Sequence, residues 1–269
     1  MLRAVRWRLQ LRAIDIFPTM GQMTYSIFGC YALNLLFPRL GEFWRSAYIA
    51  KGSNKPFSGV FGSMVADRIS DSLMVGILGI IGFIIATGAM LSFMQESTLF
   101  ETIGSILISW PVILAAAILL ICSVYIMRSK SRIAQKIRTF VSRTWHGFAV
   151  VFHMPKRGLW ALLTIGIWAS YVASMYISML AFTPTAELVS NYGFACALIT
   201  FVFGAFSMGI PSNGGIGPWQ IAIMMSLSGI FGMAHDSALA FATINLAAST
   251  ILTIILGIGT FVTIALKTR

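Results

Sequence analysis

The chain has 269 residues, of which 58% are hydrophobic and only 10% are charged, and its mean hydropathy is +0.86. Soluble domains carry about 25% charged residues, so this composition excludes an ordinary soluble protein and indicates an integral membrane protein. The formal net charge is +11, but the basic residues are confined to a few loops beside apolar runs. That distribution is typical of cytoplasmic loops and argues against nucleic acid as a partner.

Runs without Asp, Glu, Lys or Arg define the expected membrane helices. They cover residues 16–38, 72–95, 102–127, 158–186, 188–234 and 237–266. A helix needs about 20 apolar residues to cross the hydrocarbon core, and the runs lack the two-residue alternation of a lipid-facing barrel. We therefore predict an all-α, polytopic transmembrane helical bundle that forms a single membrane domain over residues 1–269.

The first run poses a topological conflict. Residues 1–12 and 51–57 are both basic, which favours the cytoplasmic side for both, yet a single apolar run of 23 residues lies between them. A re-entrant hairpin resolves the conflict: 16–38 enters the membrane, the chain turns at Pro38-Arg39-Leu40-Gly41, and 42–50 returns. The alternative is an ordinary interfacial loop between full spans.

The run 188–234 gives the same solution from the other side. It enters after Glu187, turns at Pro211-Ser-Asn-Gly-Gly-Ile-Gly-Pro218, and leaves before Asp236. We thus expect two Pro/Gly-broken, re-entrant hairpins of inverted orientation. Interrupted apolar segments at corresponding places in two halves of a chain point to a transporter site.

Residues 128–157 form a strongly basic loop, with eight Lys or Arg residues and no acid. We place this loop, and both termini, on the cytoplasmic side of the plasma (inner) membrane. An apolar stripe runs through it at helical spacing: Ile133, Ile137, Phe140, Val141, Trp145 and Phe148. Such a pattern predicts an amphipathic helix on the inner leaflet, with a protein-binding surface as the alternative.

Charged residues at membrane depth are costly, so the two charged clusters are the first candidates for a function. Arg39, Glu42 and Arg45 lie three residues apart, which allows Glu42 to pair with either arginine. Asp67 and Asp71 share one helical face just before the run 72–95. Together with Arg68, they bring the two clusters close to mutual neutralisation.

These groups are suited to an anionic lipid headgroup in an intramembrane polar cavity. The planar fork of Arg39, Arg45 or Arg68 donates two parallel hydrogen bonds to a phosphate. Gly214, Gly215 and Gly217 would expose backbone N–H groups at a helix start, which also favours an anion. Alternatively, the charges are structural ion pairs near an interface, and the glycines only turn the chain.

No enzyme motif accompanies these clusters. The sequence contains no phosphate-binding P-loop, no GxSxG and no zinc spacing. We therefore expect no catalytic residues, no metal and no cofactor.

Three motifs resemble the membrane region of lysylphosphatidylglycerol synthases, the flippase-like family. They are the segment from Leu35 to Arg45, the segment from Ala66 to Asp71, and Gly214-Gly215-Ile216-Gly217. The resemblance implies lipid translocation or lipid binding. It implies substrate-binding roles for Arg39, Gly41, Glu42, Arg45, Asp67, Arg68, Asp71, Gly214, Gly215 and Gly217. Because the last apolar run ends at the C-terminus, we expect no aminoacyl-transferase domain.

Two departures from the family pattern bear on the site. The family usually begins with further spans before a segment that resembles Arg6-Trp7-Arg8-Leu9, so we expect this chain to be short at its N-terminus and the cavity to be partly open. The family also tends to carry an arginine near the position of Asn245, so we expect an anion site that is not identical.

Three functions follow from these features. The first is a translocator of an anionic or isoprenoid-linked lipid. The second is a non-transporting accessory subunit that holds a glycosyl- or aminoacyl-transferase at the membrane. The third is a membrane enzyme acting on a lipid phosphate.

Overall fold

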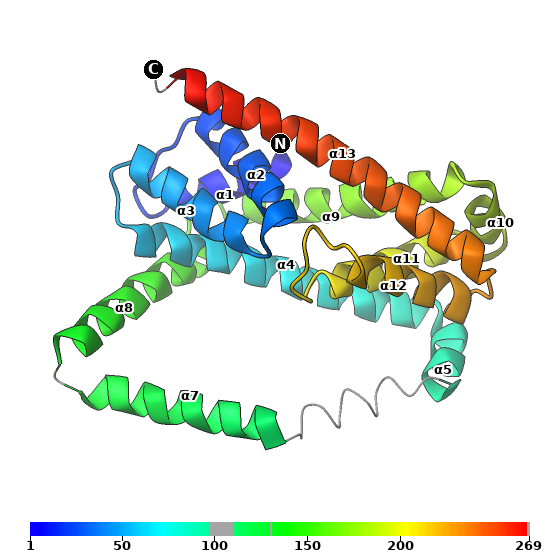
Figure 1. The fold of residues 1–269 in the computed structure, drawn as a ribbon, viewed down its shortest axis with the longest axis horizontal. Coiled ribbons are helices and arrows are strands. Elements are labelled where there is room, and N and C mark those ends of the chain that lie inside the picture. The colour runs from blue at the N-terminus through cyan, green and yellow to red at the C-terminus, as the bar shows by residue number, and fades with distance from the viewer. Residues whose placement is uncertain (97–109, 130, 268–269) are drawn as a thin grey trace.

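The computed structural model describes residues 1–96, 110–129 and 131–267, and within these ranges helices are the only regular secondary structure (Figure 1). The helices are α1 (Leu2–Arg12), α2 (Met20–Leu36), α3 (Leu40–Gly52), α4 (Phe57–Ile85), α5 (Thr87–Glu96), α7 (Trp110–Arg128), α8 (Arg132–His153), α9 (Arg157–Leu180), α10 (Thr183–Tyr192), α11 (Phe194–Ser207), α12 (Pro218–Met224), the π-helix η1 (Met225–Ile230) and α13 (His235–Lys267).

In the described residues, three helices are long and apolar enough to cross a membrane: α4, α9 and α13. The pair α10 and α11 is bent by 117°, and it adds a fourth span if the two count as one. Only 11% of the most apolar window of α13 is buried inside the protein. Side chains such as Ile251 and Ile255 are exposed, as expected for a lipid-facing surface. The prediction of an all-α polytopic membrane protein is confirmed.

Four hydrophobic clusters lie between the helices of the described residues, and two of them are large. The first packs α1 to α4 around Trp7, Leu11 and Met23. The second packs α9 to α13 around Met179 and Ile223. Lipid tails are as apolar as these side chains, so close van der Waals packing rather than water exclusion stabilises such clusters in a membrane.

The boundaries of the first long span differ from the prediction. The expected helix 72–95 begins instead at Phe57 and ends at Ile85, and the chain bends at Ala86 before the separate helix α5. Asp67, Arg68 and Asp71 consequently lie inside a membrane helix rather than ahead of it. An ionised side chain inside a span requires a partner, and the partners prove to come from other helices.

The later spans lie close to their predicted positions. Helix α9 covers most of the run 158–186, and α13 covers 237–266. The run 102–127 lies partly outside the described residues, and α7 corresponds to its second part.

Both predicted hairpins exist as helical hairpins. Helices α2 and α3 have 17 and 13 residues and are joined by a three-residue turn at 37–39. Helix α11 has 14 residues, and the segment 208–217 connects it to α12 and η1. Each arm is shorter than the roughly 20 residues of a full span. Their re-entry from opposite sides of the membrane stays a prediction.

Candidate functional site: a buried charged centre

The basic segment 1–12 is not a tail on the surface. It forms α1, which packs against α2, α4 and α9. Arg6 and Trp7 are fully buried. Arg6 is thus enclosed by three other helices, and the placement of residues 1–12 on the cytoplasmic side stays a prediction.

Arg6 is the centre of a network of ion pairs that we name the charged centre; it consists of Arg3, Arg6, Arg45, Asp67, Arg68 and Asp71. The Nη2 atom of Arg6 donates to Asp67 Oδ1 at 2.6 Å and to Asp71 Oδ1 at 2.7 Å. One guanidinium reaches both acids because residues four apart on a helix share a face. The prediction of a common face for Asp67 and Asp71 is thus confirmed.

Two further arginines approach the same acids from either side. Arg45 Nη2 lies 3.4 Å from Asp67 Oδ2, and the guanidinium stacks over the ring of Trp7 at 3.9 Å. Arg3 Nη1 lies 2.8 Å from Asp71 Oδ2, and its Nε donates to the Tyr171 hydroxyl at 2.6 Å. The centre therefore joins α1, α3, α4 and α9.

Arg68 lies at the edge of the charged centre. Its side chain is 29% exposed, and its Nη1 is 3.9 Å from Asp71 Oδ2, the longest ion pair of the network. The Nε and Nη2 atoms of Arg68 have no hydrogen-bond partner among the described residues. The half-buried Tyr31 lies within electrostatic range of both Arg68 and Arg3. Arg68 thus combines a partly exposed guanidinium with the nearby hydroxyl group of Tyr31.

The charged centre carries an excess of positive charge. Four guanidinium groups face two carboxylates. Arg45 repeats the pattern of Arg68, since its Nε and Nη1 also have no partner in the described part of the chain. The predicted near-neutrality of the clusters is wrong because two more arginines, Arg3 and Arg6, join them from α1.

The expected pairs within the first cluster do not form. Arg45 turns to Asp67, and Arg39 Nη2 donates to the carbonyl of Gly209 at 2.8 Å. Glu42 Oε2 is buried without a partner among the described residues. Helical spacing allowed the pairing with Glu42, but Asp67 on α4 pairs with Arg45 and the carbonyl of Gly209 accepts from Arg39.

Arg39 belongs instead to a contact between the tips of the two hairpins, which we name the hairpin junction. Besides the bond from Arg39, the N–H of Gly214 donates to the carbonyl of Asn34 at 3.0 Å. The N–H of Gly41 donates to Asn34 Oδ1 at 2.8 Å. A Cβ added to Gly41 would collide with the carbonyl of Cys30. Two segments far apart in the sequence thereby lie side by side.

The glycines of the second turn have left-handed backbones, with φ of 62° at Gly214, 88° at Gly215 and 90° at Gly217. Glycine adopts such angles without steric cost. The N–H of Gly217 donates to Gln220 Oε1 at 3.1 Å, and that of Gly214 is held by Asn34. Two of the three N–H groups proposed for an anion are therefore engaged within the protein.

Arg3, Arg6, Tyr31 and Tyr171 were absent from the predicted site. A signal for α1 was present, because Ala4, Trp7 and Leu11 recur at the spacing of one helical face. For a metal, no group of three or more His, Cys, Asp or Glu residues close enough to hold an ion occurs in the described ranges.

Comparison with known proteins agrees with this architecture. Residues 1–257 match the family model described as lysylphosphatidylglycerol synthase TM region. The chain is also similar to a protein of Haloferax volcanii named glycosyltransferase AglD, at 24% identity over 98% of this chain. It spans 46% of the length of that relative. No solved structure was found to match. Since the family match covers most of the sequence, including both hairpins and the charged centre, the chain belongs to the lysylphosphatidylglycerol synthase TM region family.

Proposed function

We infer that this membrane protein binds the anionic headgroup of a phospholipid or of an isoprenoid-linked lipid at the charged centre and moves that lipid between leaflets. The observation that carries this proposal is the cation excess at the partly exposed Arg68. Removing several arginines from water without an equal number of acids is unfavourable. A bound phosphate would supply the missing negative charge and bring acceptors to Arg68, whose Nε and Nη2 atoms are buried without a partner among the described residues.

The arginines of the charged centre differ in burial, and we assign their roles accordingly. Arg6 is fully buried and joins the two acids, so its role is to hold the centre together. Arg68 and Arg3 lie nearest to the surface, with side chains 29% and 13% exposed, and are the groups that meet the headgroup. Tyr31 and Tyr171 add hydroxyl groups that can bind phosphate or sugar oxygens.

Leaflet exchange in liposomes tests this function. The protein is reconstituted with headgroup-labelled phosphatidylglycerol and, separately, with a headgroup-labelled isoprenoid phosphate, and the label on the outer leaflet is quenched chemically. Wild-type protein is expected to accelerate exchange, and Arg68→Ala to abolish the acceleration. Arg12→Ala is the matched control, since it removes an exposed arginine of α1. Exchange by wild-type protein no faster than by Arg68→Ala would refute the proposal.

A second candidate is a non-transporting subunit that holds a transferase at the membrane. It is supported by the relative that is named a glycosyltransferase and is about twice as long as this chain. This function predicts no leaflet exchange, together with co-purification of a transferase whose activity falls when the chain is removed. For both candidate functions, we propose that the protein lies in the plasma membrane with both termini in the cytoplasm.

A further inference from the structure

The contact between α4 and α8 creates a second candidate lipid site. A Cβ added to Gly62 would collide with the carbonyl of Thr144, and one added to Gly147 would collide with that of Gly59. The two helices thus cross with their backbones in direct contact, which small residues permit. Near this crossing, side chains of α4 and α8 line two hollows.

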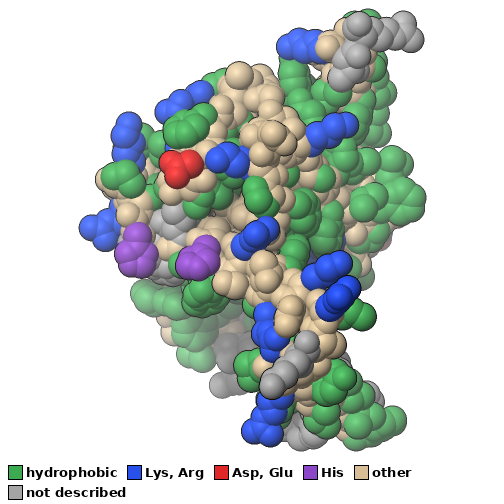
Figure 2. All heavy atoms as spheres, turned by 90° about the vertical axis from the view of Figure 1, so that its left-hand side faces the viewer, with side chains coloured by type: hydrophobic (Ala, Val, Ile, Leu, Met, Phe, Trp, Pro, Cys, Tyr) green, Lys and Arg blue, Asp and Glu red, His purple; other side chains and the backbone are tan. Residues whose placement is uncertain are grey.

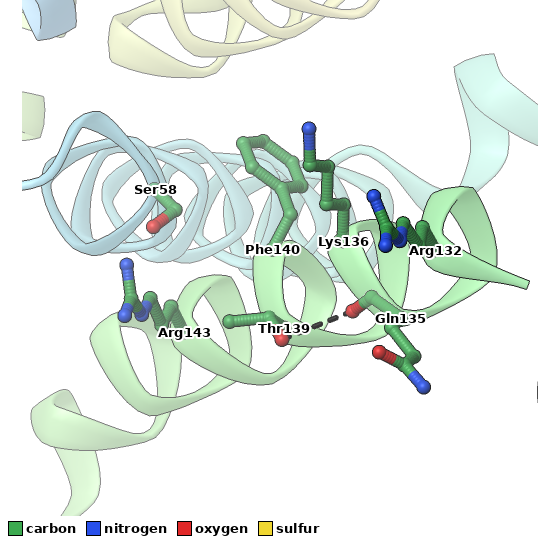
Figure 3. A pocket seen from close by; sticks show the side chains of 7 residues that line it. All are labelled: Ser58, Arg132, Gln135, Lys136, Thr139, Phe140 and Arg143. Atoms are coloured by element: carbon green, nitrogen blue, oxygen red, sulfur yellow. Dashed lines mark hydrogen bonds between the residues drawn. The ribbon is translucent and has the colours of Figure 1, made fainter.

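The first hollow is basic. It has a volume of about 580 Å³, and its lining includes Arg132, Lys136 and Arg143 with the hydroxyl-bearing Ser58 and Thr139. Figure 3 shows the ends of the three cationic side chains on the side of α8 that faces α4. The lining residues include no acid, and within the described residues no ion pair engages these three cations. The hollow is therefore suited to an anion.

The second hollow is apolar and adjoins the first. It has a volume of about 230 Å³ and is lined by Val65, Ile69, Val141, Trp145 and their neighbours, and Phe140 borders both hollows. Val65 and Ile69 share a face of α4 that differs from the face of Asp67 and Asp71, because residues two apart on a helix point in nearly opposite directions. This surface is thus separate from the charged centre.

We propose that the two hollows together bind one anionic phospholipid, with its phosphate among Arg132, Lys136 and Arg143 and an acyl chain along Val65, Ile69 and Trp145. Charge and polarity both point to this occupant, since a phosphate next to a hydrocarbon chain matches a basic hollow next to an apolar one. The face in Figure 2 agrees: Lys and Arg side chains are spread over it beside hydrophobic surface, with little acid in view. Such a lipid would fix α8 against the membrane and against α4.

Photolabelling in nanodiscs tests this site. Phosphatidylglycerol with a diazirine in its acyl chain is the probe, phosphatidylcholine with the same chain is the comparison, and labelled peptides are identified by mass spectrometry. We expect phosphatidylglycerol to label residues 65–69 and 141–148 at least tenfold more than phosphatidylcholine. Each basic residue near an anionic lipid contributes about 1 kcal/mol, so R132Q/K136Q/R143Q is expected to weaken binding about 100-fold.

The matched control is R128Q/K156Q/R157Q, which removes the same charge from residues that do not line either hollow. It is expected to leave the labelling unchanged. If the triple variant fails to fold, Lys136→Gln alone is expected to weaken binding about fivefold.

Equal labelling by both lipids, or equal loss in the control variant, would overturn the proposal. Loss of labelling in millimolar inorganic phosphate would also overturn it, because that result indicates a site for a free anion. Absence of labelling by either probe would overturn it as well and would favour a protein occupant. Arg68→Ala retains the labelling even if leaflet exchange is lost, which keeps this test distinct from that of the charged centre.

Discussion

Arg6 and Asp67 form an ion pair of 2.6 Å between side chains that are 0% and 1% exposed, and this pair joins α1 to the interior of the membrane helix α4. The same guanidinium also holds Asp71. One residue of the N-terminal segment thereby compensates both acids of a span.

Arg6→Ala is expected to destabilise the protein by about 3–5 kcal/mol, because Asp67 and Asp71 each lose their shortest ion pair, made with a fully buried side chain. Thermal unfolding in mild detergent measures the effect. Arg12→Ala, an exposed arginine of the same helix, is expected to change stability by less than about 0.5 kcal/mol. Arg6→Lys keeps a cation beside both acids and should retain part of the lost stability. An equal loss in Arg6→Lys and Arg6→Ala would contradict an electrostatic role.

Tyr171→Phe removes the hydroxyl that accepts from Arg3 Nε at 2.6 Å. A hydrogen bond to a charged group contributes about 1.5–3 kcal/mol, and the partial exposure of Arg3 reduces the expected loss to about 1–2 kcal/mol. Thermal unfolding of Tyr171→Phe checks this value. Tyr176→Phe, on the same helix, serves as the control and should unfold like wild-type protein. A similar loss in both variants would point to ring packing instead.

Gly41→Ala is expected to destabilise the first hairpin by about 1–3 kcal/mol, the usual cost of overpacking, because the new methyl group meets the carbonyl of Cys30. The melting temperature in detergent reports the loss. Gly76→Ala is the control, since nothing lies within 4 Å of its added Cβ, and alanine in a helix is favoured over glycine by about 1 kcal/mol. An equal response of the two variants would show that the turn tolerates the methyl group.

A disulfide is expected between Leu35→Cys and Gly214→Cys in a variant without its other cysteines. A Cβ on Gly214 would lie 3.8 Å from the Cα of Leu35, so the two backbones are close enough for a cross-link whose Cβ atoms are usually about 3.5–4.5 Å apart. Mild oxidation should produce the cross-link, seen as a mobility shift that a reductant reverses. Leu35→Cys with Gly193→Cys is the control pair. Equal cross-linking of both pairs would indicate that the hairpin junction does not persist in solution.

The helices and hairpins were predictable because their signals are local. Charge-free runs marked α9 and α13, and Pro38 and the Pro211–Pro218 segment marked the turns. The same criterion placed the start of α4 too late, because it treated Asp67, Arg68 and Asp71 as outside the membrane. Charges with partners can lie within a helix, and a scan for uncharged runs cannot detect the partner.

Four of the six residues of the charged centre were predicted, and Arg3 and Arg6 were not. The common face of Asp67 and Asp71 follows from their spacing of four residues. Arg6, however, lies 61 residues before Asp67, and its position depends on the packing of α1 against α4 and α9. Counting Arg3 and Arg6 as loop charges also supplied the topological conflict from which the first hairpin was inferred. The hairpin is present as a pair of helices, and its orientation in the membrane stays a prediction.

The hairpin junction has a consequence for how the protein can move. Two hydrogen bonds connect the tips, Arg39 to Gly209 and Gly214 to Asn34, and interhelical hydrogen bonds in membranes contribute about 0.6 kcal/mol each on average. Together these two bonds contribute about 1 kcal/mol, so on these bonds alone the state in which the two hairpin tips are apart is well populated at ambient temperature. A ligand that favours either state by a few kcal/mol would therefore determine whether the two hairpin tips stay in contact.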